Sequence, residues 1–370
     1  MITIIGSSIA GSALAYLLAR EKVKVALYEQ KSVADVGEKP CAEIVTKNFL
    51  EIAKALQLDT EKIIEKKFDR AIVSSPKKQV GFEIEDYAIS RKELVKQLIK
   101  KAEKAGANIF FKTKLLDFEK QEKEKQKYKL FFEKDNGKVK RNTEILVGAD
   151  GANSVVARKS GLWQKRSFLI ARQVETKKIS FDIESKAYYV FLGSPYAYYS
   201  YLIPIGKRNN GFRIGMLSYP NKISGLLFKK FLSLLGAEQE GKAEKKALIP
   251  LYYPSLHYKK ENIFICGDAA CMTKATGGGI IQALQSAIAL KKIIIDKKYD
   301  KMKRLKRELI THYFIRKVMV KLDDNQLDNL LELCNHKVKK VIASRDVLTR
   351  GAFRLFLAQP RFLLYTRFLF

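Results

Sequence analysis

The chain has 370 residues, and its content of 47% hydrophobic and 29% charged residues is typical of a globular protein and excludes an intrinsically disordered one. The formal net charge of +31 leaves three explanations open: nucleic-acid binding, attachment to an anionic membrane, or a lysine-rich surface of the thermophilic kind. The four cysteines lack the spacing of a metal site or a disulfide framework, and no motif of nucleic-acid binding is present, so we expect neither a metal nor a nucleic acid as a ligand.

The first 30 residues predict a strand, a tight turn, a helix and a second strand. Residues 2–5 form a short apolar run suited to a buried parallel strand, residues 12–20 carry apolar residues at helical spacing, and residues 23–28 contain a second β-branched run. The turn Gly6–Gly11 follows the dinucleotide-binding pattern GxGxxG, with Ser8 in place of the middle glycine. In such a unit the unpaired N–H groups at the start of the helix bind a pyrophosphate.

Two side chains refine this nucleotide site. Glu29 ends the second strand, where an acid accepts hydrogen bonds from ribose hydroxyls and repels a 2′-phosphate. Ser8 replaces the glycine that normally allows the backbone to approach the pyrophosphate, so its small side chain has to fit beside the ligand. Because the strand, the helix, the second strand and the terminal acid all agree, we expect this unit to bind a dinucleotide.

Three later segments carry residues that suit the same ligand. Arg91 begins an amphipathic helix that leads into another strand. The sequence EILVGADGANSVVAR predicts a strand that ends at Asp150 and Gly151, and NIFICGDAA predicts one that ends close to Asp268. Acidic residues directly after buried strands indicate polar contacts at the carboxyl edge of a parallel sheet.

A glycine triplet, Gly277–Gly279, stands between Asp268 and an apolar segment of helical spacing. Glycine destabilises a helix because it loses the most backbone freedom on ordering. The triplet therefore indicates that a large group approaches the backbone closely at this point.

The order of these motifs, with GxGxxG at the start, GADG in the middle and GDAA late, resembles that of flavin-dependent reductases and hydroxylases with the para-hydroxybenzoate-hydroxylase-like fold. Three segments resemble the geranylgeranyl reductase family, particularly its archaeal members. They are TGGGI at the glycine triplet, YSYLIP at 199–204, which is similar to the family signature YxWxFP, and EKPCAEIVTKNF at 38–49. Hydroxylases of this fold usually place a histidine and a proline after GDA, and this chain does not.

The resemblance implies an α/β fold, with a Rossmann-type FAD-binding domain, an antiparallel-sheet substrate domain and a helical C-terminal region. The FAD-binding domain is expected to be discontinuous and to comprise residues 1–58, 88–158 and 260–295. The substrate domain is expected to comprise residues 59–87 and 159–259, and the helical C-terminal region residues 296–370.

FAD is the cofactor that the resemblance implies. Asp268 is expected to hydrogen-bond the ribityl chain or the pyrophosphate, Arg91 to meet the cofactor, and the backbone of Leu115 to meet the adenine. The N–H groups after the glycine triplet would stabilise the negative charge of reduced flavin, and a Cβ in the triplet would collide with the ring. The expected cofactor-binding residues are Gly6, Ser8, Ala10, Gly11, Glu29, Gln30, Cys41, Ala42, Arg91, Leu115, Asp150, Gly151, Gly267, Asp268, Gly277, Gly278, Gly279 and Ile280.

The substrate residues that the resemblance implies are Tyr199, Tyr201 and Pro204, where Tyr201 takes the place of the family's tryptophan. Without the resemblance, these tyrosines are explained equally well as aromatic cross-strand pairs. Cys41 lies where the family often carries a cysteine in a loop that reaches the flavin, and it is expected to be catalytic by supplying or relaying a proton. An alternative for Cys41 is a small buried residue packed against the isoalloxazine.

The activity that the resemblance implies is reduction of isolated C=C bonds in the geranylgeranyl chain of an archaeal-type membrane lipid or isoprenoid precursor. The electron donor is external, either ferredoxin or NAD(P)H. One alternative is a flavin-dependent monooxygenase of a small aromatic or apolar substrate. An alternative of another class is a non-catalytic lipid-binding protein that keeps a flavin fold.

The carboxy-terminal residues are basic and aromatic. From Lys291 onward, 20 Lys and Arg stand against 8 Asp and Glu. The last residues alternate arginines with phenylalanines and contain no acid: Arg350, Arg354, Arg361 and Arg367 with Phe353, Phe356, Phe362 and Phe368. Such segments lie in the interface of anionic bilayers, although a helix pair that closes a substrate tunnel explains the pattern as well. With no visible signal peptide and no apolar run of about 18 residues, we expect a cytoplasmic protein at the inner face of the membrane.

Overall fold

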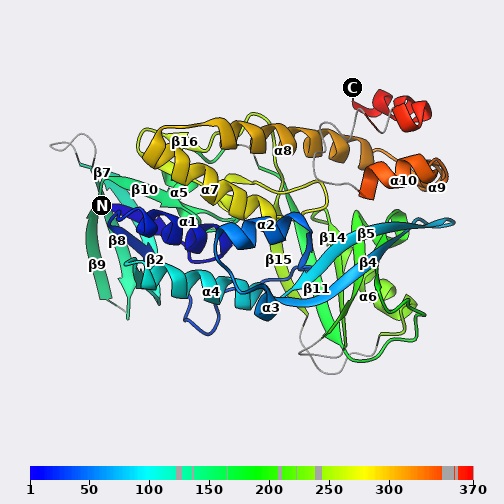
Figure 1. Ribbon diagram of the computed structural model, residues 1–370, viewed down its shortest axis with the longest axis horizontal. Coiled ribbons are helices and arrows are strands. Elements are labelled where there is room, and N and C mark those ends of the chain that lie inside the picture. Colours follow the sequence, from blue (N-terminus) through cyan, green and yellow to red (C-terminus); the bar gives the residue numbers. More distant parts are fainter. Residues whose placement is uncertain are drawn as a thin grey trace.

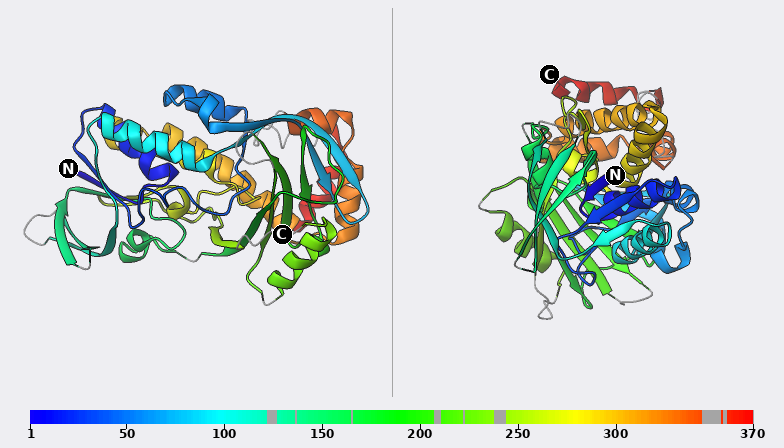
Figure 2. Two further views of the ribbon diagram at one scale, coloured as in Figure 1. Left: turned by 90° about the horizontal axis from the view of Figure 1, so that it is seen from below. Right: turned by 90° about the vertical axis from the view of Figure 1, so that its left-hand side faces the viewer.

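The computed structural model describes residues 1–121, 127–135, 137–164, 166–206, 211–221, 223–237, 244–343, 354 and 357–369. Within them the strands form three sheets, of six, eight and three strands. The molecule is elongated, with the six-stranded sheet and its helices at one end and the eight-stranded sheet at the other (Figures 1 and 2). The predicted α/β fold, with a helical C-terminal region, is confirmed.

The six-stranded sheet contains the predicted nucleotide-binding unit. Its strands are short and apolar because both faces of the sheet are covered, as in other parallel sheets. All neighbours pair in parallel except the outer pair β16–β17. In spatial order the strands are β16 (Lys259–Lys260), β17 (Ile263–Ile265), β10 (Ile145–Gly148), β1 (Ile2–Ile5), β2 (Val25–Tyr28) and β6 (Asn108–Phe110).

Helices and a small sheet cover this central sheet. Helix α1 (Ile9–Arg20) packs against both α4 (Arg91–Lys104) and α7 (Ile280–Asp296), as Figure 1 shows. The three-stranded sheet packs on β2, where the rings of Tyr28 and Phe132 stack with centroids 4.2 Å apart. Its strands are β7 (Thr113–Lys120), β8 (Tyr128–Lys134) and β9 (Gly137–Thr143).

Helix α1 begins three residues earlier than the hydrophobic pattern predicts, at Ile9 instead of Ser12. Gly11 therefore lies inside the helix, where a Cβ would overlap the carbonyl oxygen of Gly6. The glycine lets the first turn of the helix press against the preceding loop, and periodicity of side chains alone does not detect such a residue.

The eight-stranded sheet is antiparallel except for the parallel pair β12–β4. Alternate residues along a strand face opposite sides. On β13, Leu202 packs with Phe228 and Phe231 of α6 (Ser224–Leu234), whereas Tyr201 faces the other side. In spatial order the strands are β15 (Lys245–Pro250), β11 (Phe168–Thr176), β14 (Gly211–Ser218), β13 (Tyr199–Ile205), β12 (Ala187–Phe191), β4 (Ile64–Ser74), β5 (Gln79–Ile89) and β3 (Ile44–Thr46).

The remaining elements connect the sheets and form the carboxy-terminal region. Helix α8 packs along α7, and Asp328 of α9 accepts hydrogen bonds from Ser75 Oγ (2.5 Å) and Lys77 N (3.0 Å) beyond β4. Among the described residues, no helix is both long and apolar enough to cross a bilayer. These elements are α2 (Asn48–Ala55), α3 (Thr60–Ile63), α5 (Val155–Lys159), η1 (Ser194–Tyr196), η2 (Gly267–Ala270), α8 (Asp300–Met319), α9 (Asp324–Glu332), α10 (His336–Ala343) and η3 (Pro360–Leu369).

Candidate functional site

A cavity of about 610 Å³ lies at the carboxyl ends of the parallel strands and extends to β15 of the large sheet. This edge of an open parallel sheet is where ligands of such folds bind. The cavity brings together residues that the sequence analysis assigned to the cofactor from segments far apart in the chain. Those that line it are Gly6, Ser8, Ala10, Glu29, Gln30, Cys41, Arg91, Leu115, Asp150, Gly151, Gly267, Asp268, Gly277, Gly279 and Ile280.

Three of the expected cofactor residues are not part of this lining. Gly11 lies inside α1, where it permits the close approach to Gly6. Ala42 directly follows Cys41, and its carbonyl oxygen accepts a hydrogen bond from Arg213 Nη1 at 3.2 Å. Gly278 lies between two glycines that do line the cavity.

The glycine-rich turn is shaped by its backbone. Gly6 has a φ of 97°, and a Cβ there would stand 2.5 Å from the carbonyl oxygen of Ala149. Ser8 is the residue directly before α1, and its hydroxyl accepts a hydrogen bond from Arg91 Nη2 at 2.7 Å. The serine that departs from the motif therefore joins the turn to the start of α4, a contact that a glycine could not make.

Glu29 is held firmly at the end of β2. One of its carboxylate oxygens accepts hydrogen bonds from Ser7 N (2.8 Å) and Ser7 Oγ (3.2 Å), and the other from Lys31 N (2.8 Å). A carboxylate with fixed donors on both oxygens presents its remaining lone pairs to the cavity in one orientation. Its predicted contact with ribose hydroxyls is compatible with this geometry and stays a prediction.

The two acids of the later strands have different partners. Asp150 accepts hydrogen bonds from Ser154 Oγ (2.5 Å) and Val156 N (3.1 Å), and burial raises the pKa of its carboxyl. Asp268 forms an ion pair with Lys39. Burial acts to raise the pKa of Asp268, but the charge and the hydrogen bond of Lys39 together hold it below its ordinary value. Asp268 is therefore a carboxylate inside the cavity.

The glycine triplet forms the entrance to α7. Gly277 has a φ of 77°, and Gly279 directly precedes the first helical residue, Ile280. The first turn of α7 contains no acid, and no side chain caps its N-terminus. Because Gly279 and Ile280 line the cavity, the N–H groups and the positive dipole end of this helix lie at the cavity. We predicted that a Cβ in the triplet would meet the cofactor; at Gly277 it would in addition stand 2.6 Å from Leu217 Cδ2 of the large sheet.

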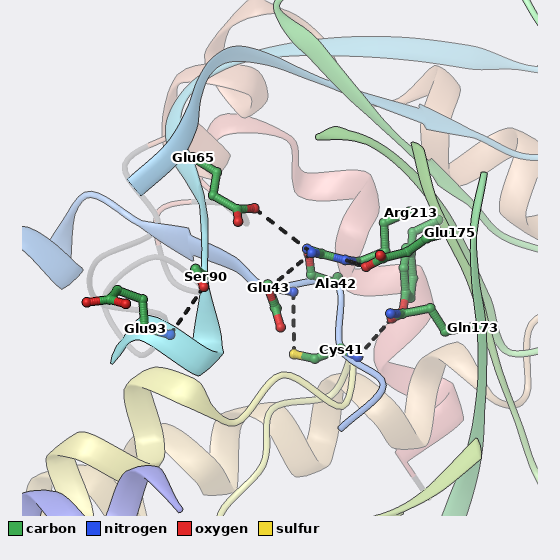
Figure 3. A network of polar contacts seen from close by, with 10 residues as sticks. Cys41, Ala42, Glu43, Glu65, Ser90, Glu93, Gln173, Glu175 and Arg213 are labelled. Atoms are coloured by element: carbon green, nitrogen blue, oxygen red, sulfur yellow. Dashed lines mark hydrogen bonds and ion pairs between the residues drawn. The ribbon is translucent and has the colours of Figure 1, made fainter. Parts of the chain in front are cut away.

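Cys41 lines the cavity from the segment that joins the two large sheets. Its N–H donates to Gln173 Oε1 at 2.8 Å, and its Sγ accepts a hydrogen bond from Glu43 N at 3.4 Å (Figure 3). Burial raises the pKa of the thiol, although the charge of Arg91 opposes that effect. The sulfur therefore carries its proton at neutral pH and can act as an acid.

The three predicted substrate residues all lie on β13 and outside the lining of the cavity. Tyr201 is buried, and its hydroxyl donates to Gln173 Oε1 at 2.8 Å, so this amide oxygen joins Tyr201 to the backbone of Cys41. Tyr199 lies beside it, with ring centroids 6.0 Å apart, and Pro204 pairs with Phe212 of β14. Their role toward substrate stays a prediction.

Sequence reasoning missed three residues of the site. Lys39 pairs with an acid 229 positions away, and Gln173 and Arg213 lie within the large sheet. Lys39 lies within the segment EKPCAEIVTKNF, directly before Pro40 and Cys41, but a single sequence does not indicate which acid forms an ion pair with it. Gln173 and Arg213 carried a weaker signal, because polar residues inside apolar strands are costly unless they are paired.

The comparisons with known proteins agree with the geometry. A family model described as FAD binding domain matches residues 1–215. A digeranylgeranylglycerophospholipid reductase of Methanosphaera stadtmanae is 24% identical, over 94% of this chain and 91% of the relative. These two matches support a geranylgeranyl-reductase-like FAD protein and an FAD-dependent oxidoreductase, as predicted.

Two solved structures share the fold. A geranylgeranyl bacteriochlorophyll reductase-like protein from Thermoplasma acidophilum superimposes with a TM-score of 0.80 at 18% identity, covering 100% of this chain and 98% of the other. A flavin-dependent halogenase superimposes with a TM-score of 0.71 at 18% identity, covering 94% of this chain and 72% of the other. At these identities the likeness shows the fold alone, which serves more than one chemistry.

The family model confirms FAD as the predicted cofactor, and the residues of the cavity are chemically compatible with it. The N-termini of α1 and α7 both reach the cavity, and anions bind at such ends. Among the described residues, the Nε of Arg91 is a buried donor without a hydrogen-bond partner. A pyrophosphate beside Ser8 and Arg91 would satisfy it.

Proposed function

The chain belongs to the family of FAD-binding domain proteins, and on that premise we propose that it hydrogenates isolated C=C bonds of geranylgeranyl chains. The substrate class is an archaeal-type membrane lipid or an isoprenoid precursor. The observation that carries the proposal is the position of a thiol, Cys41, whose pKa burial raises, in the same cavity as the N-terminus of α7. A reduction of this kind needs a hydride and a proton at neighbouring carbons, and the thiol is a source of the second.

The chain's own groups divide the work. FAD supplies the hydride when it is bound and reduced. The N–H groups after Gly279 stabilise negative charge near them, and Cys41 Sγ holds the proton for the second alkene carbon. Gln173 fixes the backbone of Cys41, so the thiol keeps its direction while substrate enters.

The face of the large sheet that carries Tyr201 supports an apolar substrate. It gathers the buried side chains Phe68, Tyr188, Tyr201, Ile203, Leu217, Ile249 and Leu251. Ile249 of this face lines the cavity, so the apolar surface reaches the place where a polyprenyl chain would lie. Tyr199, Tyr201 and Pro204 would form part of this wall, with the electron donor, ferredoxin or NAD(P)H, acting from outside.

Peripheral contact with an anionic membrane on the cytoplasmic side is part of the proposal. In the described part of the tail, Leu357, Leu363 and Leu364 are exposed, and so are Arg354 and Arg361. Arg350, Phe353 and Phe356 of the predicted pattern lie outside the described residues. Each basic side chain near anionic lipid contributes roughly 1 kcal/mol.

The alternative for the tail, packing on the enzyme body, also has support. Element η3 contacts α8, and Tyr365 Oη donates to the carbonyl oxygen of Gln326 at 3.2 Å. Removal of residues 351–370 should abolish sedimentation with anionic vesicles and leave FAD bound, and about 0.5 M salt should weaken binding of the full chain. Loss of flavin with aggregation would instead make the tail part of the fold.

The test of the activity is anaerobic. Photoreduced protein is mixed with a geranylgeranyl lipid, and reoxidation of the flavin is followed together with the product mass, which should rise by one H₂ per bond reduced. A monooxygenase would leave the lipid unchanged and consume oxygen and NAD(P)H with a small aromatic compound. A non-catalytic lipid-binding protein would bind the lipid without reoxidation of the flavin.

A further inference from the structure

A cluster of ionisable side chains lies beside Cys41 (Figure 3), and its members Glu43, Glu65, Glu175 and Arg213 are not part of the cavity lining to which Cys41 belongs. Its centre is Arg213 of β14, whose guanidinium pairs with Glu43 at 3.1 Å, Glu175 at 3.2 Å and Glu65 at 4.0 Å. The side chains of Arg213 and Glu43 are only 6% and 14% exposed. Three carboxylates thus face one guanidinium in a place with little water.

Such a cluster favours retention of a proton. If all three carboxyls were ionised, their charges would exceed that of Arg213, and buried like charges are costly. Burial raises the pKa of Glu43, against the effects of Arg213 and Arg91 and with that of Glu65. Arg213 and Arg91 oppose this rise, while the arrangement of three carboxyls around one guanidinium favours a proton on one of them.

Glu43 also has an unusual backbone. Its φ of 56° lies in the left-handed region, which residues with a Cβ seldom adopt. This conformation places the N–H of Glu43 on the sulfur of Cys41, while its carboxylate meets Arg213. Strained residues of this kind persist where the surrounding structure holds them, and they gather at functional sites.

The position of Glu43 relative to Cys41 is the second observation. In Figure 3 the carboxylate of Glu43 points toward the sulfur of Cys41, and the charge of Glu43 raises the pKa of the thiol. Cys41 lines the cavity, whereas Glu43 does not. The thiol therefore stands between the cavity and this carboxyl.

We propose that Glu43 is the proton-returning residue of the site: after Cys41 has given its proton to the substrate carbon, the carboxyl of Glu43 reprotonates the Cys41 thiolate. The inference rests on the proposed function. The alkene has then gained a hydride from the reduced cofactor and a proton from Sγ, the S–H bond is restored from the Oε–H bond, and the charge left on Glu43 is stabilised by Arg213. The carboxylate regains a proton from solvent at Glu175, the most exposed acid of the cluster.

Several ionisable groups surround Glu43, and the test has to distinguish its effect on Cys41 from theirs. They are Cys41 on its own segment, Glu65 of β4, Arg91 of α4, Glu175 of β11, Tyr201 of β13 and Arg213 of β14. Glu65→Gln is the matched control, because Glu65 shares Arg213 and in Figure 3 lies farther from the sulfur of Cys41 than Glu43 does. Glu43→Gln keeps the size of the side chain and removes the proton that can be donated.

The first measurement is substrate turnover by the FAD-loaded enzyme. In Glu43→Gln the first alkene per enzyme should be reduced at the wild-type rate, because Cys41 starts protonated, and later turnovers should be slower by about 100-fold, in the range of lost acid–base catalysis. Glu65→Gln should show no such burst. Equal slowing of the first and later turnovers in Glu43→Gln, or none at all, overturns the inference.

The second measurement needs no substrate. The pH dependence of methanethiosulfonate labelling, read at Cys41 by mass spectrometry in the FAD-loaded protein, should shift toward lower pH by about one unit or more in Glu43→Gln and remain in place in Glu65→Gln. An unshifted profile overturns the coupling even if the lipid is a substrate. Failure of the lipid to react, with a shifted profile, sinks the proposed function and leaves the coupling standing.

A third measurement covers the case in which Glu43→Gln loses FAD. In the otherwise unchanged chain, infrared spectroscopy at neutral pH should detect a protonated carboxylic acid whose C=O band moves in Cys41→Ser. Absence of this band, or a band at the same frequency in Cys41→Ser, overturns the inference.

Discussion

The two ends of the cavity are built in different ways. At the cofactor end, backbone turns from Gly6 and Gly277 and the start of α7 form the surface, and each is encoded by a few adjacent residues. At the thiol end, side chains from distant segments hold the backbone around the thiol: Gln173 accepts a hydrogen bond from Cys41 N, and Arg213 donates one to the carbonyl oxygen of Ala42. The cofactor end therefore depends mainly on turns that adjacent residues encode, with the Asp268–Lys39 pair as its long-range contact, whereas the thiol end is held by side chains from distant segments.

The largest expected effect is at the cofactor end. Asp268→Ala removes a carboxylate from the cavity and leaves the half-buried Lys39 without its partner. Loss of its predicted charge-assisted hydrogen bond to the cofactor, worth about 3 kcal/mol, should lower FAD affinity by about 150-fold, with a lower melting temperature because bound FAD stabilises the native state. Flavin absorbance per protein measures the loss.

Asp296→Ala, at the exposed end of α7, is the control and should stay yellow. Normal flavin content in Asp268→Ala would show that the backbone turns alone hold the cofactor, which would sharpen the contrast between the two ends.

Cys41→Ser tests the other end with the next largest effect. A hydroxyl is a much weaker acid than a thiol, so anaerobic alkene reduction should slow by about 100-fold while FAD remains bound. Stopped-flow reoxidation of the photoreduced flavin measures the rate. An unchanged rate would reduce Cys41 to packing against the isoalloxazine, with the proton coming from elsewhere.

Gly215→Ala tests the thiol end indirectly, through Tyr201. Gly215 stands opposite Tyr201 on β14, and a Cβ there would overlap the tyrosine ring. The ring has to move and its hydrogen bond to Gln173 has to break, so the free energy of unfolding should fall by about 2 kcal/mol, as for other overpacked cores. Denaturant unfolding measures this.

Gly225→Ala is the matched control, because a Cβ there makes only ordinary contact with Arg172. Flavin content should stay normal in both variants. Equal free energies of unfolding for Gly215→Ala and Gly225→Ala would show that the ring of Tyr201 can move without cost. That result would contradict the close packing inferred at the thiol end.

Ser8→Ala should give the smallest effect. It removes the acceptor of the Arg91 hydrogen bond, a contact worth about 1 kcal/mol, so FAD affinity should fall about fivefold. Titration of the apoprotein with FAD measures it. In an Arg91→Lys background the same substitution should cost almost nothing further, and an additive loss would separate Ser8 from Arg91.

The contrast also explains what could be predicted from the sequence. Gly6, Asp150 and Asp268 belong to motifs in which spacing encodes geometry, so their meeting in one cavity followed from the chain order of strands and turns. The contacts of Lys39 and Gln173 were not predicted. Lys39 pairs with a group 229 positions away and Gln173 with one 132 positions away, and such pairing depends on sheet order and register, which a single sequence does not reveal.

The segment Lys39–Ala42 is fixed at both ends, by Asp268 on the cofactor side and by Gln173 and Arg213 on the sheet side. Two residues of chain span at most about 7 Å, so the thiol has little freedom to wander from either anchor. Under the proposed function, mutations that reshape the apolar wall for a longer, shorter or differently branched hydrocarbon would leave the Cys41 thiol in place beside the cofactor. In such a fold, the range of substrates can evolve by substitutions in the apolar face of the large sheet, while the segment Lys39–Ala42 and its contacts stay unchanged.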